Sequence, residues 1–158
     1  MRCREPLCET DMTGKHPIEE LFTYRLHVLK KQTDRTMNEA FASALALSLT
    51  EARLLISVGA FGPISVSDLG RASNLDRSQA SRATDVLERR GLLEKTTNAA
   101  DARGVLIKLT AQGRNTYRRA SAISKSGNEA ILGVLSAHER EVLHAALAKL
   151  VEQGGAQD

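Results

Sequence analysis

Apolar residues near the N-terminus recur at spacings of three and four, the periodicity of an amphipathic helix. The positions are Ile18, Leu21, Phe22, Leu26, Leu29, Met37, Ala40, Phe41, Ala44 and Leu45. They predict one long helix over about residues 18–47, which at 1.5 Å per residue would be about 45 Å long. A small core cannot cover that length, so we expect part of the helix to contact a partner.

Start and stop signals divide the next stretch into shorter helices. Thr50, followed by Glu51, is expected to cap a helix that ends in the Gly- and Pro-containing residues 59–63. Ser65 and Asp68 have the capping-box spacing, which predicts that another helix begins there and runs to about residue 73.

A further helix is predicted immediately afterwards. Asn74 is suited to the left-handed residue that ends a helix, and Asp76 with Gln79 forms a second start signal only two residues later. The new helix should cover about residues 77–90 and end at Gly91. Two helices joined by so short a turn predict a helix-turn-helix.

The second helix of this pair has two different faces at 100° per residue. Small or apolar residues share the face predicted to lie inward: Ala80, Ala83, Thr84 and Leu87. Polar residues lie opposite or on the flanks: Ser78, Gln79, Ser81, Arg82, Asp85 and Arg89. Such an outer face can reach base edges and phosphates in a major groove, although an ordinary amphipathic surface helix has the same pattern.

After Gly91 the apolar period changes from that of a helix to that of strands. Residues 92–97 and 105–110 are strand candidates, and the polar residues 98–104 between them form the expected hairpin tip. A hairpin directly behind a recognition-type helix is a wing. Arg103 at its tip is suited to a narrow minor groove, with Asp101 orienting the guanidinium, and simple solvent exposure of Arg103 is the alternative.

Two helices are predicted to complete the chain. Thr110 should cap the first, over about residues 111–134, and Ser136 with Glu139 repeats the capping-box spacing for the second. The apolar residues of this last helix are Val142, Leu143, Ala146, Leu147, Leu150 and Val151. Residues 154–158 are expected to form a frayed tail.

Composition restricts the class of protein. A chain of 158 residues with 3% aromatic residues and no Trp is expected to form one domain whose core consists of Leu, Ile, Val and Ala. No stretch is long and apolar enough for a membrane span, and the polar lead-in of residues 1–17 does not resemble a secretion signal, so we expect a cytoplasmic protein. Cys3 and Cys8 lack metal-ligand spacing, which argues against a metal site and a disulfide scaffold.

The charge is unevenly distributed although the formal net charge is only +3. Eleven Lys or Arg residues and five Asp or Glu residues lie between Arg71 and Arg119, whereas the rest of the chain is mildly acidic. The asymmetry favours a nucleic-acid-binding face, and an uneven solvated surface is the alternative.

Three strings closely resemble the winged-helix core of the multiple-antibiotic-resistance regulator (MarR) family. They are Asp76-Arg-Ser-Gln-Ala-Ser-Arg82, Leu87-Glu-Arg-Arg-Gly-Leu-Leu93 and Asp101-Ala-Arg-Gly-Val-Leu-Ile-Lys-Leu-Thr110. The wing motif, Asp-x-Arg followed by an alternating strand that ends in Leu-Thr, is the more specific part. The order of predicted helices resembles the family's over roughly residues 18–153.

The resemblance implies a mainly α (α+β) winged helix-turn-helix with a two-stranded wing. Residues 50–110 would form the winged helix, and residues 18–47 and 111–153 would intertwine with a second copy in a homodimer. Such a dimer would read a pseudo-palindromic operator in double-stranded DNA. By motif position, the DNA-binding residues would be Ser78, Gln79, Ser81 and Arg82 in the major groove and Arg103, braced by Asp101, in the minor groove.

The resemblance also implies transcriptional regulation, by default repression that a small aromatic or anionic effector relieves. No cofactor is implied, and the effector pocket stays unassigned. Tyr24, Arg25, His27 and Arg118 are conceivable effector contacts, with packing or surface roles as the alternative. No Gly-rich phosphate loop, nucleophile elbow or His-Glu-x-x-His helix indicates an enzyme. The competing hypothesis is a winged helix that binds only proteins.

Overall fold

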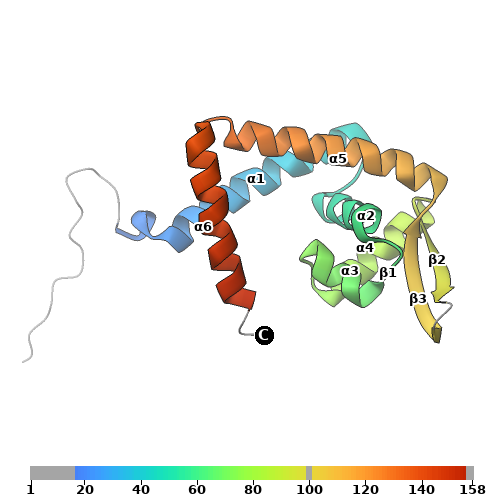
Figure 1. Cartoon of the computed structure of the whole chain (residues 1–158). Coiled ribbons are helices and arrows are strands. Elements are labelled where there is room, and N and C mark those ends of the chain that lie inside the picture. The colour runs from blue at the N-terminus through green and yellow to red at the C-terminus, as the bar shows by residue number, and fades with distance from the viewer. Residues whose placement is uncertain (1–16, 99–100, 156–158) are drawn as a thin grey trace, which may run out of the picture. The chain divides into compact units, whose positions relative to one another are not determined.

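A computed structural model describes residues 17–98 and 101–155, and for residues 98, 101–104 and 155 it describes the backbone alone. The chain divides into two compact units, Met1–Thr36 and Met37–Asp158, which are described separately below. Helix α1 (Phe22–Leu45) contributes residues to both units. Figure 1 labels the elements along the chain.

The described part of the first unit contains η1 (Pro17–Glu20), a short 3₁₀ helix, and the first half of α1. The predicted long helix is therefore shorter than expected, because its first turn is 3₁₀ and α1 ends at Leu45. Large apolar side chains of this unit are exposed: Ile18, Leu21, Phe22, Tyr24, Leu26 and Leu29. Among the described residues of this unit none is a buried hydrophobic residue.

Four helices of the second unit follow the predicted order: α2 (Leu49–Phe61), α3 (Val66–Ser73), α4 (Arg77–Arg89) and α5 (Ala111–Leu132). The prediction that Thr50 caps α2 is wrong. Ser48 is the N-cap: its hydroxyl accepts from the amide of Glu51, and the Glu51 carboxylate accepts from the amide of Ser48 at 2.9 Å. This reciprocal pair satisfies two amides that Thr50 could not reach together.

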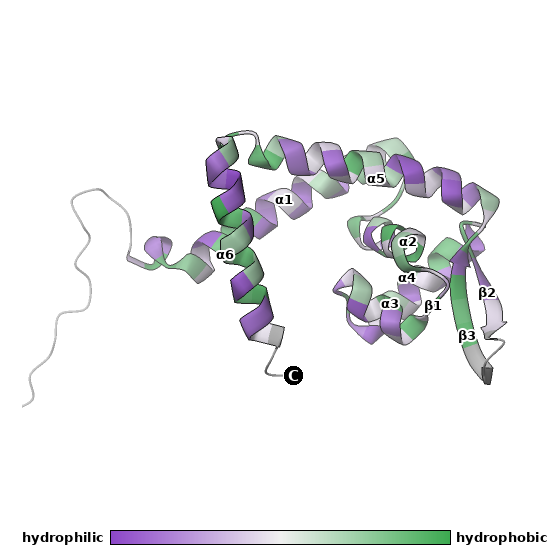
Figure 2. Cartoon of the chain, in the orientation of Figure 1, coloured by the Kyte–Doolittle hydropathy of each residue, from purple (hydrophilic) through white to green (hydrophobic). Residues whose placement is uncertain are grey.

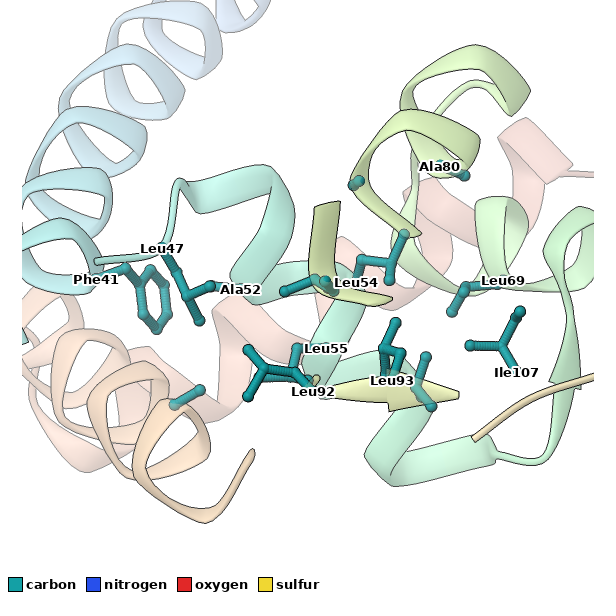
Figure 3. Close-up of a cluster of buried hydrophobic side chains, with 14 residues drawn as sticks. Phe41, Leu47, Ala52, Leu54, Leu55, Leu69, Ala80, Leu92, Leu93 and Ile107 are labelled. Carbon is teal, nitrogen blue, oxygen red and sulfur yellow. The ribbon is translucent and has the colours of Figure 1, made fainter. Parts of the chain in front are cut away.

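The core of the second unit forms where α2 packs against α3, α4, α5 and β3. Leu54 and Leu55 of α2 are fully buried, and Figure 3 shows them among side chains from the neighbouring elements. The core contains one aromatic residue among the described residues, Phe41, and otherwise aliphatic side chains. The expected aliphatic core is confirmed.

A three-stranded antiparallel sheet in the order β1-β3-β2 stands beside these helices. β2 (Leu93–Asn98) and β3 (Asp101–Leu109) form the predicted wing hairpin, and β1 (Ile64–Ser65) adds a third strand that the sequence did not indicate. The hairpin is longer than predicted, because Asn98 and Asp101, expected in the tip, already pair with each other.

The last two helices agree with the capping signals. Thr110 accepts from the amide of Gly113 at the start of α5, and the hydroxyl of Ser136 accepts from the amide of Glu139 at the start of α6 (Ala137–Gly155). α6 runs to Gly155, beyond the expected helix end. Among the described residues no single helix could cross a membrane, and α1 with α2 meets the length and composition only when the two are combined across their bend.

Candidate nucleic-acid interface

The helix-turn-helix consists of α3, a short turn and α4, and local signals fix its geometry. Asn74 ends α3 in the left-handed conformation, with φ 52°, as predicted. Asp76 then begins α4: its carboxylate accepts from the amide of Gln79 at 2.7 Å, and the Gln79 side-chain oxygen accepts from the amide of Asp76. Leu75 between them packs against the core. The turn thus fixes where α4 starts relative to α3.

The two faces of α4 are arranged as predicted. Its buried residues are Ala80, Ala83, Thr84 and Leu87, the four expected on the inner face. The predicted major-groove residues, Ser78, Gln79, Ser81 and Arg82, are all exposed. Small inner residues let the helix backbone sit close to α2 and α3 while its polar face stays accessible to solvent. The structure therefore brings these four side chains together on one exposed surface.

Three arginines of α4, Arg77, Arg82 and Arg89, are exposed and make no ion pair with any described residue. Arg77 was not among the predicted contacts, although its place at the first helical position of the recognition helix could have indicated it. Unpaired guanidinium groups at the surface are available to phosphates or to guanine edges.

Other basic residues of the basic stretch are held by partners within the chain. Lys95 of β2 contacts Glu88 at 2.6 Å and Asp85 at 3.3 Å, both on α4. The hydrogen bond to Glu88, supported by Asp85, raises the pKa of Lys95 above its ordinary value. Lys108 pairs with Glu94 across the hairpin at 3.4 Å. These contacts fasten the wing to α4 and remove their charges from the set that is free for a partner.

A similar pairing occupies the first helix of the motif. Arg71 of α3 bonds Asp68, which also accepts from the hydroxyl of Ser65 at 2.6 Å. The hydrogen bond from Ser65 has the larger effect and that from Arg71 the smaller, and together they hold the pKa of the Asp68 carboxyl below its ordinary value.

The predicted minor-groove residues, Asp101 and Arg103, lie on β3 near the hairpin tip. Their side chains are outside the part of the chain that the structure describes, as are Cys3 and Cys8. The minor-groove roles of Asp101 and Arg103 therefore remain predictions from the wing motif.

A second feature is a cavity of about 480 Å³ between the end of α2, the end of β3 and the start of α5. Its lining residues are Val58, Gly59, Gly62, Pro63, Lys108, Leu109, Ala111, Arg114, Tyr117 and Arg118. The lining includes three cations and no acid. The Tyr117 ring packs directly on the α2 backbone, since a Cβ at Gly59 would lie only 2.3 Å from it. Among the described residues no group of His, Cys, Asp and Glu could hold a metal ion.

A model of the MarR family matches residues 47–104. The multiple antibiotic resistance protein MarR of Salmonella typhimurium is 31% identical over 88 residues, which is 56% of this chain and 60% of that protein. The chain thus aligns with less than two thirds of the length of this relative.

Solved structures extend the likeness beyond the winged helix. A probable transcriptional regulator from Pseudomonas aeruginosa is 26% identical with a TM-score of 0.69, covering 84% of this chain and 98% of that one. A mutant MarR from E. coli in complex with operator DNA has the same fold, with 24% identity and a TM-score of 0.74 over 86% of this chain and 99% of that one. Family model, curated relative and solved structures agree on the same winged-helix core, and over that core the chain is similar to proteins of the MarR family.

Proposed function

We propose that the chain is a sequence-specific, double-stranded DNA-binding transcriptional regulator. The observation that carries the proposal is the exposed face of α4, where Ser78, Gln79, Ser81 and Arg82 lie together and three arginines lack an ion-pair partner among the described residues. A helix with this face fits a major groove, because hydroxyl, amide and guanidinium groups bind base edges and phosphates. The solved complex of a MarR with operator DNA supports the same assignment.

Each predicted residue has a distinct role in this proposal. Arg82 makes no ion pair with a described residue, and its guanidinium has the reach and the donors for a bidentate contact with guanine. Ser78 and Ser81 can hydrogen-bond phosphates or bases. The side-chain oxygen of Gln79 already accepts from the amide of Asp76, so its side-chain amide group is left to donate to DNA. Arg103 of the wing would enter the minor groove, with Asp101 orienting it.

The competing hypothesis, a winged helix that binds only proteins, fits this surface less well. The core of a protein interface is depleted of charged residues, whereas the exposed face of α4 has Ser, Gln and Arg and no large apolar side chain. The similar structure from Pseudomonas aeruginosa is a probable transcriptional regulator, which supports a role without catalysis.

We also propose a homodimer, built on the apolar residues at both ends of the chain. Val142, Leu150 and Val151 of α6 are about half exposed or more, and Val134 is 87% exposed. Figure 2 shows hydrophobic segments between hydrophilic ones along α6. Apolar residues in such number on a single chain are typical of an interface. A two-fold dimer would read half-sites about 34–36 Å apart, or a multiple of that distance.

The DNA contact is tested by removing one guanidinium from α4. Arg82→Ala should weaken binding to a duplex selected from a random pool by about 1–3 kcal/mol, because a bidentate base contact is lost. Lys125→Ala removes the same charge from an exposed position on α5 and is the matched control. Fluorescence anisotropy with selected and scrambled duplexes measures both. Equal affinity of the two variants for the selected duplex would overturn the role of Arg82.

The cavity beside α5 supports a proposed effector site for a small aromatic or other organic anion. Its volume of about 480 Å³ lies within the range of small-molecule pockets, with apolar walls from Val58 and Leu109. Arg118 and Arg114 supply cationic donors, and Tyr117 supplies a ring and a hydroxyl. Tyr24, Arg25 and His27, the other conceivable contacts, belong to the first unit. Binding there, next to the end of β3, would relieve repression by moving the wing.

Benzoate is a suitable probe of this site, with neutral benzamide as the matched control. Titration calorimetry should detect benzoate binding that Arg118→Ala weakens at least about tenfold, because a charge-assisted hydrogen bond is lost. Arg82→Ala should bind benzoate like the wild type. Equal binding of benzoate and benzamide, or wild-type affinity in Arg118→Ala, would contradict the site.

A further inference from the structure

Two arginines outside the proposed DNA-binding and effector residues donate hydrogen bonds to the backbone at the C-terminal end of α1. Arg90 follows the last residue of α4, and its guanidinium donates to the carbonyl oxygens of Ala46 at 2.8 Å and Leu45 at 3.1 Å. Arg119 of α5 donates to the carbonyl oxygen of Ala44 at 2.9 Å. Three successive carbonyls at the end of α1 and just after it thus accept from two guanidinium groups, one directly after α4 and one on α5. We refer to Arg90 and Arg119 as the arginine clamp.

Two of the three carbonyls that the clamp binds, those of Ala44 and Leu45, are among those that helix geometry leaves free at the end of α1. The last four carbonyls of an α-helix have no partner within the helix, and the helix dipole places partial negative charge there. Arg90 is further held by Glu51, whose carboxylate lies 3.8 Å from it and also accepts from the amide of Ser48. The clamp therefore reaches the N-terminus of α2 as well.

The turn between α1 and α2 requires such support. Ala46 has φ 52°, a left-handed conformation that glycine adopts without cost and alanine does not. Its carbonyl is one of those that Arg90 holds. The next residue, Leu47, is 1% exposed and belongs to the core. A conformation of this kind persists only where surrounding contacts hold it, and Arg90 supplies two of them.

We propose that Arg90 and Arg119 are positioning residues: Arg90 sets the orientation of α4 by fixing its C-terminal end to the end of α1, and Arg119 fixes the same end of α1 to α5. The inference rests on the proposed function, because its consequence is specific DNA binding. Arg90 is separated from Ala46 by 44 residues, and Arg119 from Ala44 by 75, so the clamp joins segments that are distant in sequence. A displacement of α1 or α5 would be transmitted to the recognition helix through these bonds. The clamp thus acts without touching DNA.

Hydrogen exchange of the DNA-free protein tests the clamp independently of DNA binding. Arg90→Gln and Arg119→Gln remove the guanidinium, Arg90→Lys retains charge and a single donor site, and Lys125→Ala is the charge-matched control. We expect faster exchange in residues 41–49 and at the C-terminal end of α4 for the Gln variants, a smaller effect for Lys, and none for the control. Wild-type exchange in both Gln variants would overturn the proposal. If Arg90→Gln fails to fold, Arg119→Gln and Arg90→Lys decide the outcome.

DNA binding then separates positioning from contact. A positioning role predicts that both Gln variants lose about tenfold in affinity for the selected duplex, within the range of coupled sites, and keep wild-type affinity for scrambled DNA. The salt slope should stay unchanged, whereas loss of a phosphate contact would reduce it by about 0.9. A reduced slope, or equal losses on both duplexes, would contradict positioning. A wild-type chain that selects no duplex would refute the proposed function, and the exchange experiment would still decide the clamp.

Discussion

Gly113, in the first turn of α5, lies where the wing joins the C-terminal helices. The residue is buried, and a Cβ built on it would lie 1.9 Å from the carbonyl oxygen of Leu92 and 2.9 Å from its carbonyl carbon. Real Cβ atoms essentially never lie closer than 3.0 Å to another heavy atom. The backbone of residue 113 or of Leu92 would therefore have to move to accommodate the new Cβ. That carbonyl also accepts from the amide of Thr110 at 3.1 Å. The substitution Gly113→Ala therefore strains the junction of β3, α5 and the end of α4.

The expected change in the free energy of unfolding combines two destabilising effects and one stabilising effect. Overpacking costs about 1–3 kcal/mol, and a backbone clash belongs at the upper end of that range. A weakened hydrogen bond between Thr110 and Leu92 adds about 1 kcal/mol. The higher helix propensity of alanine returns about 1 kcal/mol. We expect a net loss of about 3 kcal/mol, which at about 2–4 °C per kcal/mol lowers the melting temperature by roughly 6–12 °C.

Thermal unfolding followed by circular dichroism, at one protein concentration, measures the effect. Gly154→Ala is the matched control, because it also lies in a helix but a Cβ there meets nothing within 4 Å. Gly154 is the penultimate residue of α6, where a fraying helix end gains little from helix propensity, so we expect the control to melt within a degree or two of the wild type. Equal melting temperatures for Gly113→Ala and Gly154→Ala would refute the close approach of α5 to Leu92.

Three further predictions concern the wing, the dimer and a helix cap. Arg103→Ala should reduce DNA affinity and lower the salt slope by about one unit, and an unchanged slope and affinity would remove the wing from the contact set. Leu147→Glu should disrupt the dimer by burying an unpaired charge, and light scattering that finds an intact, equally stable dimer would contradict this. The amide and hydroxyl of Ser136 hold the pKa of Glu139 below its ordinary value, so its cap stabilises the fold above the unfolded carboxyl pKa and weakens as pH falls through the lower folded pKa. Melting temperatures of Glu139→Gln and wild type should therefore converge in acid, and a constant difference would argue against the linkage.

Much of the fold was predictable because its signals are local. Asn74 and Asp76 act on amides within a few residues, so the helix-turn-helix could be derived from spacing alone. The buried face of α4 followed from helical periodicity. The predicted cap of α2 was wrong although its signal is also local. Ser48 and Glu51 have the capping-box spacing, but Thr50 lies nearer the apolar residues of α2, which favoured it instead.

Features that depend on distant pairing were not predictable. β1 consists of two residues, and it is a strand only because Ile64 pairs with Ile107, far along the chain. The arginine clamp likewise joins residues with no local relation, and from sequence Arg90 and Arg119 counted simply as part of a basic stretch. Sequence reasoning thus predicted the basic charge of the region, whereas the structure separates the arginines held by carbonyls or carboxylates from those of α4, which make no ion pair with a described residue.

A dimer that presents the polar face of α4 to the major groove should select specific DNA. Selection of bound fragments from a random-sequence duplex pool by the full chain measures this. We expect enrichment of one pseudo-palindromic site with half-sites about one helical turn apart or a multiple of it, and loss of that enrichment when Ser78, Gln79, Ser81 and Arg82 are all replaced by alanine. A pool that remains random, or a quadruple variant that is still folded and selects the same site, would show that α4 does not read DNA through this face.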